Sequence, residues 1–181
     1  MSLIVFETHA SSVDNEAGLA SGHADVPLSD TGVSQARELG ERRRADPPRA
    51  VYCSDLERSW RTAALAFEGR RIPIIRDRRL READYGELTR QPRDQIDRIR
   101  AEHIESPFPG GESYAQVVAR VESFLDETEF PADGYSLIVG HRATHYALDH
   151  LLAAEPLEVV VAKKFVWRPG WEYRRKHLRD W

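Results

Sequence analysis

Two histidines, His9 and His141, hold equivalent positions in distant parts of the chain. Each follows a short apolar run rich in β-branched residues, residues 3–6 before His9 and residues 137–139 before His141. Such a run, ending in a polar residue and leading into a helical segment, is typical of a buried parallel strand. Ligands of open α/β sheets bind at the carboxyl ends of these strands. The pair therefore predicts one shared site in an enzyme, although either histidine taken alone would more simply be structural.

Four short segments contain this pair of histidines and the other polar residues that could take part in a reaction with them. They are Thr8-His9-Ala10 with Asn15, Ser54 to Arg58, Leu80 to Gly86, and Gly140-His141-Arg142. Together they offer two imidazoles, two guanidiniums (Arg58 and Arg142) and a carboxylate (Glu82). Phosphoryl transfer uses these groups, because cations hold the phosphate oxygens while a nucleophile approaches in line with the leaving oxygen. The sequence thus predicts chemistry on a phosphate group.

The elements that must position these residues alternate along the chain. Pro73 favours an edge position for the third strand. Ser29 or Asp30 is expected to cap the first helix and Ser54-Asp55 the second. The alternation predicts a single α/β domain over residues 1–181, a three-layer α/β/α sandwich with a mainly parallel sheet, a C-terminal hairpin or antiparallel edge strand, and a small cap around residues 86–111. The expected strands are 3–8, 50–53, 72–75 and 135–139, the expected helices are 31–44, 55–67, 93–104, 112–127 and 142–153, and the expected hairpin joins 163–168 to 171–176.

The composition excludes several other kinds of protein. With 41% hydrophobic and 31% charged residues, the chain is typical of a globular protein with a packed core. A net charge of −4 argues against nucleic acid as a partner, and the clusters Arg42-Arg43-Arg44 and Arg174-Arg175-Lys176 are interpreted as solvated faces. A single cysteine, Cys53, allows no internal disulfide and is expected to be a buried, inert thiol.

The pattern of apolar residues also bears on location and assembly. No apolar stretch approaches the ~20 residues that span a bilayer, and the N-terminal apolar run is too short for a signal peptide. We therefore expect a cytoplasmic protein without a membrane partner. The apolar terminal hairpin could pair across a homodimer.

In its motifs the chain resembles the histidine phosphatase superfamily, which includes the cofactor-dependent phosphoglycerate mutases. The resemblance covers nearly the whole chain, from Leu3 to the strand near Trp171. Five fragments occur in the family's order: His9 with Asn15, Gly22 and Leu28-Ser29-Asp30-Thr31-Gly32; Ser54-Asp55-Leu56-Glu57-Arg58 through Ala63; Leu80-Arg81-Glu82 through Gly86; Pro109-Gly110-Gly111-Glu112-Ser113; and the strand ending in His141.

The resemblance implies a catalytic role for three residues. His9, as a neutral imidazole, would attack phosphorus and carry the phosphoryl group covalently. His141, protonated, would stabilise the charge on the transferring group. Glu82 would give a proton to the leaving oxygen and then activate water, with Asp84 and Glu87 as alternative acids. No metal or other cofactor is implied.

The same resemblance implies the residues that would bind the substrate, a small phosphorylated metabolite. Arg58 would hold two phosphate oxygens with its planar fork, and Asn15 would add a neutral hydrogen bond. Gly22 and His23 fall in the loop that faces the leaving group. His145, one helical turn beyond the second catalytic histidine, is interpreted as structural.

The chain departs from the family's Arg-His-Gly motif on both sides of the nucleophile. Thr8 replaces the arginine, so one cationic phosphate ligand is missing, and Ala10 replaces the glycine, which matters only where the backbone needs a positive φ. Arg142 stands where family members often have a small residue. We therefore predict that Arg142 supplies the charge lost at position 8.

Four functions follow from these observations. The first is a phosphomonoester hydrolase that acts through a phosphohistidine. The second is a phospho-ligand-binding member of the same fold in which the altered motif has abolished turnover. A phosphoglycerate-type mutase is disfavoured by the modest cap, and a metal-dependent hydrolase using His9, His23, His141 or His145 with Asp14 or Glu82 is disfavoured because no tight metal-ligand spacing occurs.

Overall fold

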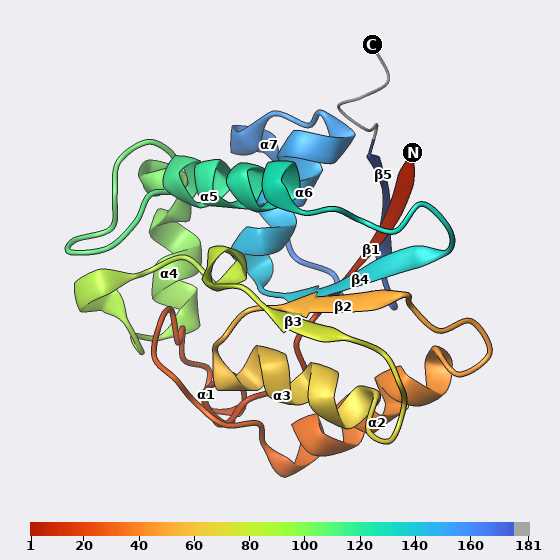
Figure 1. Cartoon of the computed structure of the whole chain (residues 1–181). Helices are drawn as coiled ribbons and strands as arrows, with labels where there is room; N and C mark the ends of the chain where they lie inside the picture. The colour runs from red at the N-terminus through yellow and green to blue at the C-terminus, as the bar shows by residue number, and fades with distance from the viewer. Residues whose placement is uncertain (176–181) are drawn as a thin grey trace.

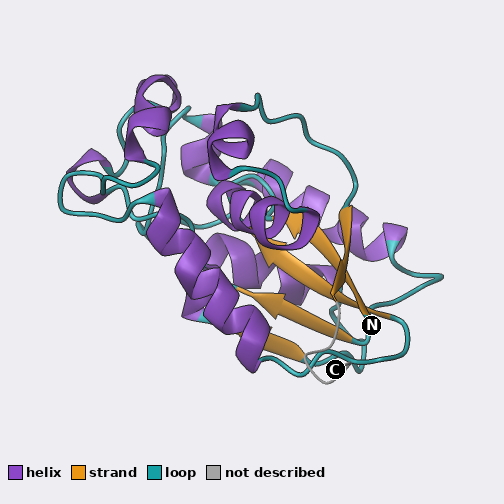
Figure 2. Cartoon of the chain, turned by 90° about the horizontal axis from the view of Figure 1, so that it is seen from above, coloured by secondary structure: helices purple, strands orange, loops and turns teal. Residues whose placement is uncertain are grey.

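The computed structural model describes residues 1–175, which form one sheet with helices on both faces (Figures 1 and 2). In this part of the chain the sheet has five strands in the order β3-β2-β4-β1-β5, all parallel except β5. This arrangement confirms the predicted α/β sandwich with a mainly parallel sheet and an antiparallel edge strand. The strands are β1 (Ser2–Thr8), β2 (Ala50–Cys53), β3 (Ile74–Arg76), β4 (Tyr135–Gly140) and β5 (Trp171–Arg175).

Helices cover the two faces of the sheet in separate groups. One face carries α2 (Asp30–Arg42) and α3 (Glu57–Ala66), and the other carries α5 (Tyr114–Glu127), α6 (Arg142–Ala153) and α7 (Leu157–Ala162) (Figure 1). Side chains alternate along each strand, so that Phe6 and Ile138 pack under one group while Val5 and Leu137 pack under the other. Both faces of the central strands are therefore buried, which explains their continuous apolar runs.

Short helices and turns complete the fold near the carboxyl ends of the strands. The α-helices there are α1 (Val13–Glu16) and α4 (Arg93–Ile99). The 3-10 helices are η1 (Arg78–Leu80), η2 (Gly86–Leu88) and η3 (Arg100–His103). The predicted helix over 93–104 is thus divided between α4 and η3.

Residues 86–111, predicted as a cap, dock on the loop that follows β1. The backbone N–H of Ala20 donates to the carbonyl of Gln91 at 2.9 Å, and the N–H of Arg93 donates to that of Gly18 at 2.8 Å. Arg90, at a positive φ of 64°, forms an ion pair with the buried Asp14. These contacts fix α4 against the start of the chain and hence beside the end of β1.

The predicted terminal hairpin is wrong in its first half. Residues 163–168 form no strand, and β5 instead pairs antiparallel with β1, from Phe6 opposite Trp171 to Ser2 opposite Arg175. The alternation of side chains in residues 163–168 suggested that they pair with the strand that follows. That strand, β5, instead pairs with the edge of β1, which is a longer strand. The last residue of the predicted strand, Lys176, lies outside the described residues.

The caps of the predicted helices agree with the structure in one case and differ in another. Ser29 caps α2 as expected, accepting from the N–H of Gly32 at 3.0 Å. Ser54 and Asp55 do not cap α3, which begins after Leu56 without a side-chain cap. The Ser54 hydroxyl instead forms a hydrogen bond with His141, and the Asp55 carboxylate pairs with Arg81. The sequence analysis also missed α7, whose β-branched residues favour a strand by propensity. Its buried positions Leu157, Val160 and Val161 follow helical spacing.

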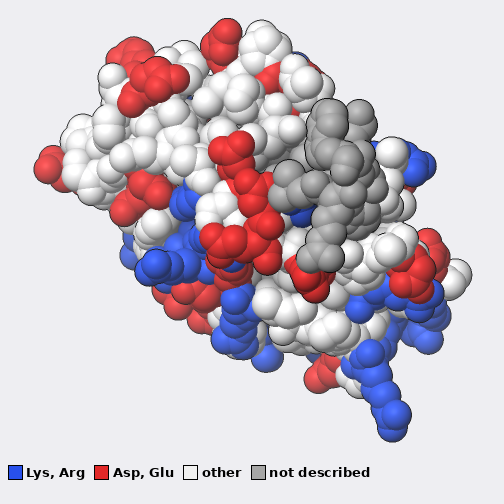
Figure 3. Space-filling view, turned by 45° about the horizontal axis from the view of Figure 1, so that its top comes forward, with Lys and Arg blue, Asp and Glu red and all other residues white. Residues whose placement is uncertain are grey.

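Positively and negatively charged side chains both occur on the surface of the protein. Acidic and basic side chains are interspersed on the face shown in Figure 3. The cluster at the end of α2, however, is more than a solvated face: Arg42 and Arg43 both donate to Glu7, which is only 2% exposed. A buried carboxylate requires such partners.

In residues 1–175 no helix is long and apolar enough to cross a membrane.

Candidate active site

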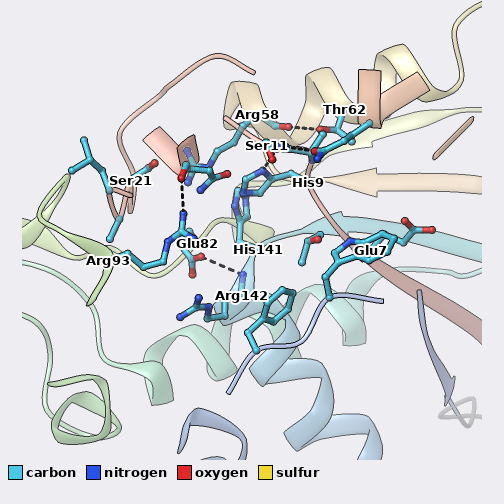
Figure 4. A pocket seen from close by; sticks show the side chains of 18 of the residues that line it. Glu7, His9, Ser11, Ser21, Arg58, Thr62, Glu82, Arg93, His141 and Arg142 are labelled. Carbon is cyan, nitrogen blue, oxygen red and sulfur yellow. Dashed lines mark hydrogen bonds between the residues drawn. The ribbon is translucent and has the colours of Figure 1, made fainter. Parts of the chain in front are cut away.

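His9 and His141 meet at the carboxyl edge of the sheet, as their positions in the sequence predict. They follow adjacent strands, β1 and β4, in which Thr8 is paired with Gly140. The N–H of His9 donates to the carbonyl of Gly140 at 2.9 Å, and the two imidazole centroids lie 4.9 Å apart (Figure 4). The register of the parallel sheet therefore sets the separation of the two rings.

The hydrogen bonds of His9 leave one ring nitrogen available as a nucleophile. Nδ1 lies 2.7 Å from the carbonyl oxygen of Ala10. Since a carbonyl oxygen can only accept, Nδ1 carries the proton and Nε2 carries the lone pair. Burial, followed by the positive charges of Arg58 and Arg93, lowers the pKa of His9 to about 3, although the hydrogen bond to Ala10 acts in the opposite direction. The imidazole is thus neutral at physiological pH, as a nucleophile requires.

The alanine that follows the nucleophile fits the loop without strain. Ala10 is not among the described residues with a positive φ, so a glycine is not needed there. Its N–H donates to the Thr62 hydroxyl at 3.0 Å, and that hydroxyl donates to the Arg58 carbonyl at 2.6 Å. This chain of hydrogen bonds ties the nucleophile loop to α3.

His141 is held by Ser54, a contact that the sequence analysis did not predict. Its Nε2 and the Ser54 hydroxyl share a hydrogen bond of 2.6 Å, and both residues are buried. Burial, followed by the charge of Arg58 and the proximity of His9, lowers the pKa of His141 well below its ordinary value. This shift favours the neutral imidazole, so the protonated form of His141 stays a prediction that depends on the negative charge of a phosphate group beside it.

Arg58 places a buried cation at the floor of the pocket. It is 2% exposed, and its two terminal nitrogens donate to the carbonyls of Ala24 and Gly22 at 2.8 and 2.7 Å. The fork predicted to hold two phosphate oxygens therefore also holds the loop after β1. The N–H groups not used in these bonds remain for a ligand, since a guanidinium carries five.

Gly22 is required by this geometry. It adopts a φ of +50°, and an added Cβ would lie 3.1 Å from the Tyr85 ring and 3.2 Å from the Tyr85 nitrogen. The left-handed conformation directs its carbonyl oxygen toward Arg58. Gly22 lines the pocket, as predicted for a residue near the substrate.

Asn15 also lines the pocket, and only the oxygen of its side-chain amide is hydrogen-bonded within the described part of the chain. Its Oδ1 accepts from the N–H of Ser12 at 3.1 Å, in the capping box of α1. Its NH₂ group makes no hydrogen bond within residues 1–175. This amide can therefore donate to a ligand oxygen, the role that the resemblance implies.

The Glu82 carboxylate lines the pocket beside the start of α6. Its oxygens accept from the backbone N–H groups of Ala83, Arg142 and Ala143 at 2.9, 3.2 and 3.0 Å. The first turn of α6 therefore fixes its orientation. Neither alternative acid, Asp84 nor Glu87, lines this pocket.

His23, predicted to contact the leaving group, follows Gly22 in the chain but is not among the residues that line the pocket. Its Nε2 is 2.8 Å from the backbone carbonyl of Glu82, and its ring lies near Asp84 and Glu112. In this arrangement His23 supports the backbone of the predicted proton donor. A direct contact with substrate stays a prediction.

Thr8 and two further arginines lie along the same pocket. Arg142 lines it as predicted, but its guanidinium is paired with Asp97. Arg93, which the sequence analysis did not single out, lines the pocket from α4, and its charge acts on His9. The only signal for Arg93 was its position at the start of a charged helix in the cap, and such helices are usually solvated.

The pocket has a volume of about 570 Å³, within the range of small-molecule sites. It extends from the histidine pair past Thr8 to Phe165 and Trp167, whose indole is 55% exposed. This volume accommodates a phosphate and an organic group attached to it.

Other candidate residues do not contribute to the pocket. Cys53 is buried, which raises its pKa to about 12 and makes its thiol inert at physiological pH. His145 packs against the rings of Phe6 and Trp171, which also contact each other, and is therefore a structural residue. Among residues 1–175 there is no group of three histidine, cysteine, aspartate or glutamate side chains that could hold a metal ion.

The sheet and the paired imidazoles place the protein in the class of α/β proteins with a two-histidine pocket at the carboxyl edge of the sheet. A family model described as the histidine phosphatase superfamily (branch 1) matches residues 4–160, and the chain belongs to this superfamily.

Named phosphatases are among the relatives. The chain is 30% identical over 168 residues to the adenosylcobalamin/alpha-ribazole phosphatase of Salmonella typhimurium, covering 88% of this chain and 82% of that protein. Bacillus stearothermophilus YhfR has a similar structure, with a TM-score of 0.78, 26% identity and coverage of 95% and 90%. A mycobacterial glucosyl-3-phosphoglycerate phosphatase solved with VO3 has a TM-score of 0.76, 26% identity and coverage of 91% and 86%.

Proposed function

We propose that the protein is a phosphomonoester hydrolase that acts on a small phosphorylated metabolite through a phosphohistidine. One observation carries the proposal: a neutral histidine whose Nε2 is available lies beside a buried arginine and a second histidine in one pocket. Membership of a superfamily with named phosphatases supports it.

In the first step Nε2 of His9 attacks phosphorus, and the bond from phosphorus to the ester oxygen breaks. The leaving oxygen takes the proton that Glu82 supplies as the general acid. Arg58 and the Asn15 amide hold the phosphate oxygens, while His141 donates to the transferring group when the phosphate dianion has raised its pKa. The product alcohol then leaves.

In the second step water attacks the phosphohistidine and the bond from phosphorus to Nε2 breaks. The ionised Glu82 takes the proton from water and returns to its starting form, and inorganic phosphate is released. The three backbone donors around this carboxylate keep it facing the pocket in both steps.

The direct test compares wild-type protein with the His9→Gln variant in hydrolysis of p-nitrophenyl phosphate near pH 6. Loss of more than about 10³-fold in kcat/KM is expected, since the nucleophile is removed without adding charge. His150→Gln, which changes a histidine outside the pocket, should retain wild-type turnover. Phosphate labelling that is alkali-stable, acid-labile and absent from His9→Gln would identify the intermediate.

Thr8 is the observation that favours a second candidate, a binding protein without turnover. Folded wild-type protein that binds inorganic phosphate but hydrolyses no phosphomonoester would support that candidate. Turnover that His9→Gln leaves intact would contradict the phosphohistidine route.

A further inference from the structure

The pocket contains four arginines, and they differ in whether their charge is already neutralised. Arg58, Arg42, Arg93 and Arg142 all contribute to its lining. Arg42 donates to Glu7 at 2.8 Å, and Arg142 is paired with Asp97. A carboxylate partner reduces the charge that either group can offer to a bound anion.

Arg93 forms no ion pair with any residue in the range 1–175. The one hydrogen bond that its guanidinium makes within these residues runs from Nη2 to the backbone carbonyl of Asn15 at 3.4 Å, near the upper limit for such a bond. The side chain is half-buried, so its charge is only partly screened by water. An unpaired cation in this position is available for an anionic ligand.

The fold directs this cation toward the reacting groups. The N–H of Arg93 donates to the Gly18 carbonyl at 2.8 Å, and Ile96, one turn later, is buried in the core, so α4 is fixed on both sides. Figure 4 shows the side chain running toward the centre of the pocket, where Glu82 and His141 lie. Its charge also acts on His9, lowering the pKa of the nucleophile.

We propose that Arg93 binds an oxygen of the phosphoryl group and replaces the cation that Thr8 does not provide. The proposal rests on the proposed function and deepens it by assigning a phosphate ligand from the cap. Arg142 was the sequence-based prediction for this role, and its pairing with Asp97 favours Arg93 instead.

The first test measures the Kd of inorganic phosphate by calorimetry for wild type and for the Arg93→Ala and Arg93→Lys variants. Loss of one charged hydrogen bond predicts a Kd about 10- to 100-fold higher for Arg93→Ala, with Arg93→Lys recovering part of the affinity. Arg98→Ala is the matched control, because Arg98 lies on the same helix, is paired with Asp94 and does not line the pocket. Its Kd should equal that of wild type.

The second test replaces the positive charge lost in Arg93→Ala with an arginine at position 8, the last residue of β1. Adding Thr8→Arg to Arg93→Ala should recover phosphate affinity and kcat/KM for p-nitrophenyl phosphate at least tenfold relative to Arg93→Ala alone, because Thr8 lies on the same pocket. A residue that only supports Asn15 would not be replaced in this way.

Three results would overturn the proposal. One is a phosphate Kd for Arg93→Ala within twofold of wild type. Another is a loss that neither Arg93→Lys nor Thr8→Arg recovers, which would show a purely structural role. The third is a loss of affinity confined to Arg142→Ala. Failure of the proposed function is distinguishable, since wild-type turnover and its dependence on His9 are measured independently of these variants.

Discussion

The half-buried nucleophile His9 should make the stability of the folded protein depend on pH, and one substitution should remove this dependence. Burial holds the pKa of His9 at about 3 in the folded protein, against 6.5 in the unfolded chain. Above about pH 6.5 both states are unprotonated, so His9 contributes no pH dependence. As the pH falls below that value, the unfolded state binds a proton that the folded state does not, and the free energy of unfolding decreases.

The size of the effect follows from these two pKa values. At about pH 5 the unfolded state is favoured by at most about 2 kcal/mol through His9 alone, and pocket water on the half-buried ring reduces this figure. The result changes little if the folded pKa is one unit higher, because about pH 5 would still lie above it. The decrease is complete only near pH 3, where the folded state also binds the proton.

Urea unfolding followed by tryptophan fluorescence measures this quantity at about pH 7.5 and about pH 5. Wild type should lose more stability than His9→Gln between the two conditions, by up to about 2 kcal/mol, because glutamine does not titrate. The His150→Gln variant controls for general effects of removing a histidine. Equal losses in wild type and His9→Gln would refute the assignment of a strongly lowered pKa to the nucleophile.

Three further predictions concern single positions. Ser54→Ala should lower kcat for p-nitrophenyl phosphate about tenfold with the fold retained by circular dichroism, because it removes the hydrogen bond that orients His141. Unchanged kcat would contradict that role. Gly22→Ala should destabilise the protein by more than about 1 kcal/mol, and by more than Gly18→Ala, since both have a positive φ but only Gly22 lacks space for a Cβ. Equal losses in urea unfolding would show that the close contacts relax. Trp167→Ala should raise KM more for an aryl phosphate than for glycerol 2-phosphate, because the indole forms part of the pocket wall; equal changes would place the leaving group elsewhere.

Most of the fold could be predicted because local patterns and long-range packing agree. The apolar runs before His9 and His141 are buried strands, and the predicted boundaries of β2 and α6 match the structure. The failures occur where local preference and tertiary packing conflict. Residues 157–162 are rich in valine but form a helix, because that arrangement buries three of them against the core. Residues 163–168 alternate like a strand but find no partner, because β5 occupies the edge of β1.

In the site, too, the positions set by local pattern could be predicted, whereas the contacts between distant segments could not. Its main residues could be predicted because parallel strands bring their carboxyl ends to one edge, so His9 and His141 must converge. Partnerships across the fold could not be predicted from spacing. Ser54 was expected to cap a helix and instead holds His141. The contact of His23 with the backbone carbonyl of Glu82 was not predicted either.

The sequence by itself determined the class of fold and the pair of histidines, because both follow from residue type and local pattern. The importance of Arg58 and the missing cation at Thr8 followed only from the resemblance to the superfamily. Only the tertiary structure decided which charges are free. A guanidinium offers its full charge to a ligand only when no carboxylate lies beside it, and that depends on contacts between distant segments. Asp97 meets Arg142 across the pocket and Glu7 meets Arg42, whereas Arg93 meets no carboxylate in residues 1–175.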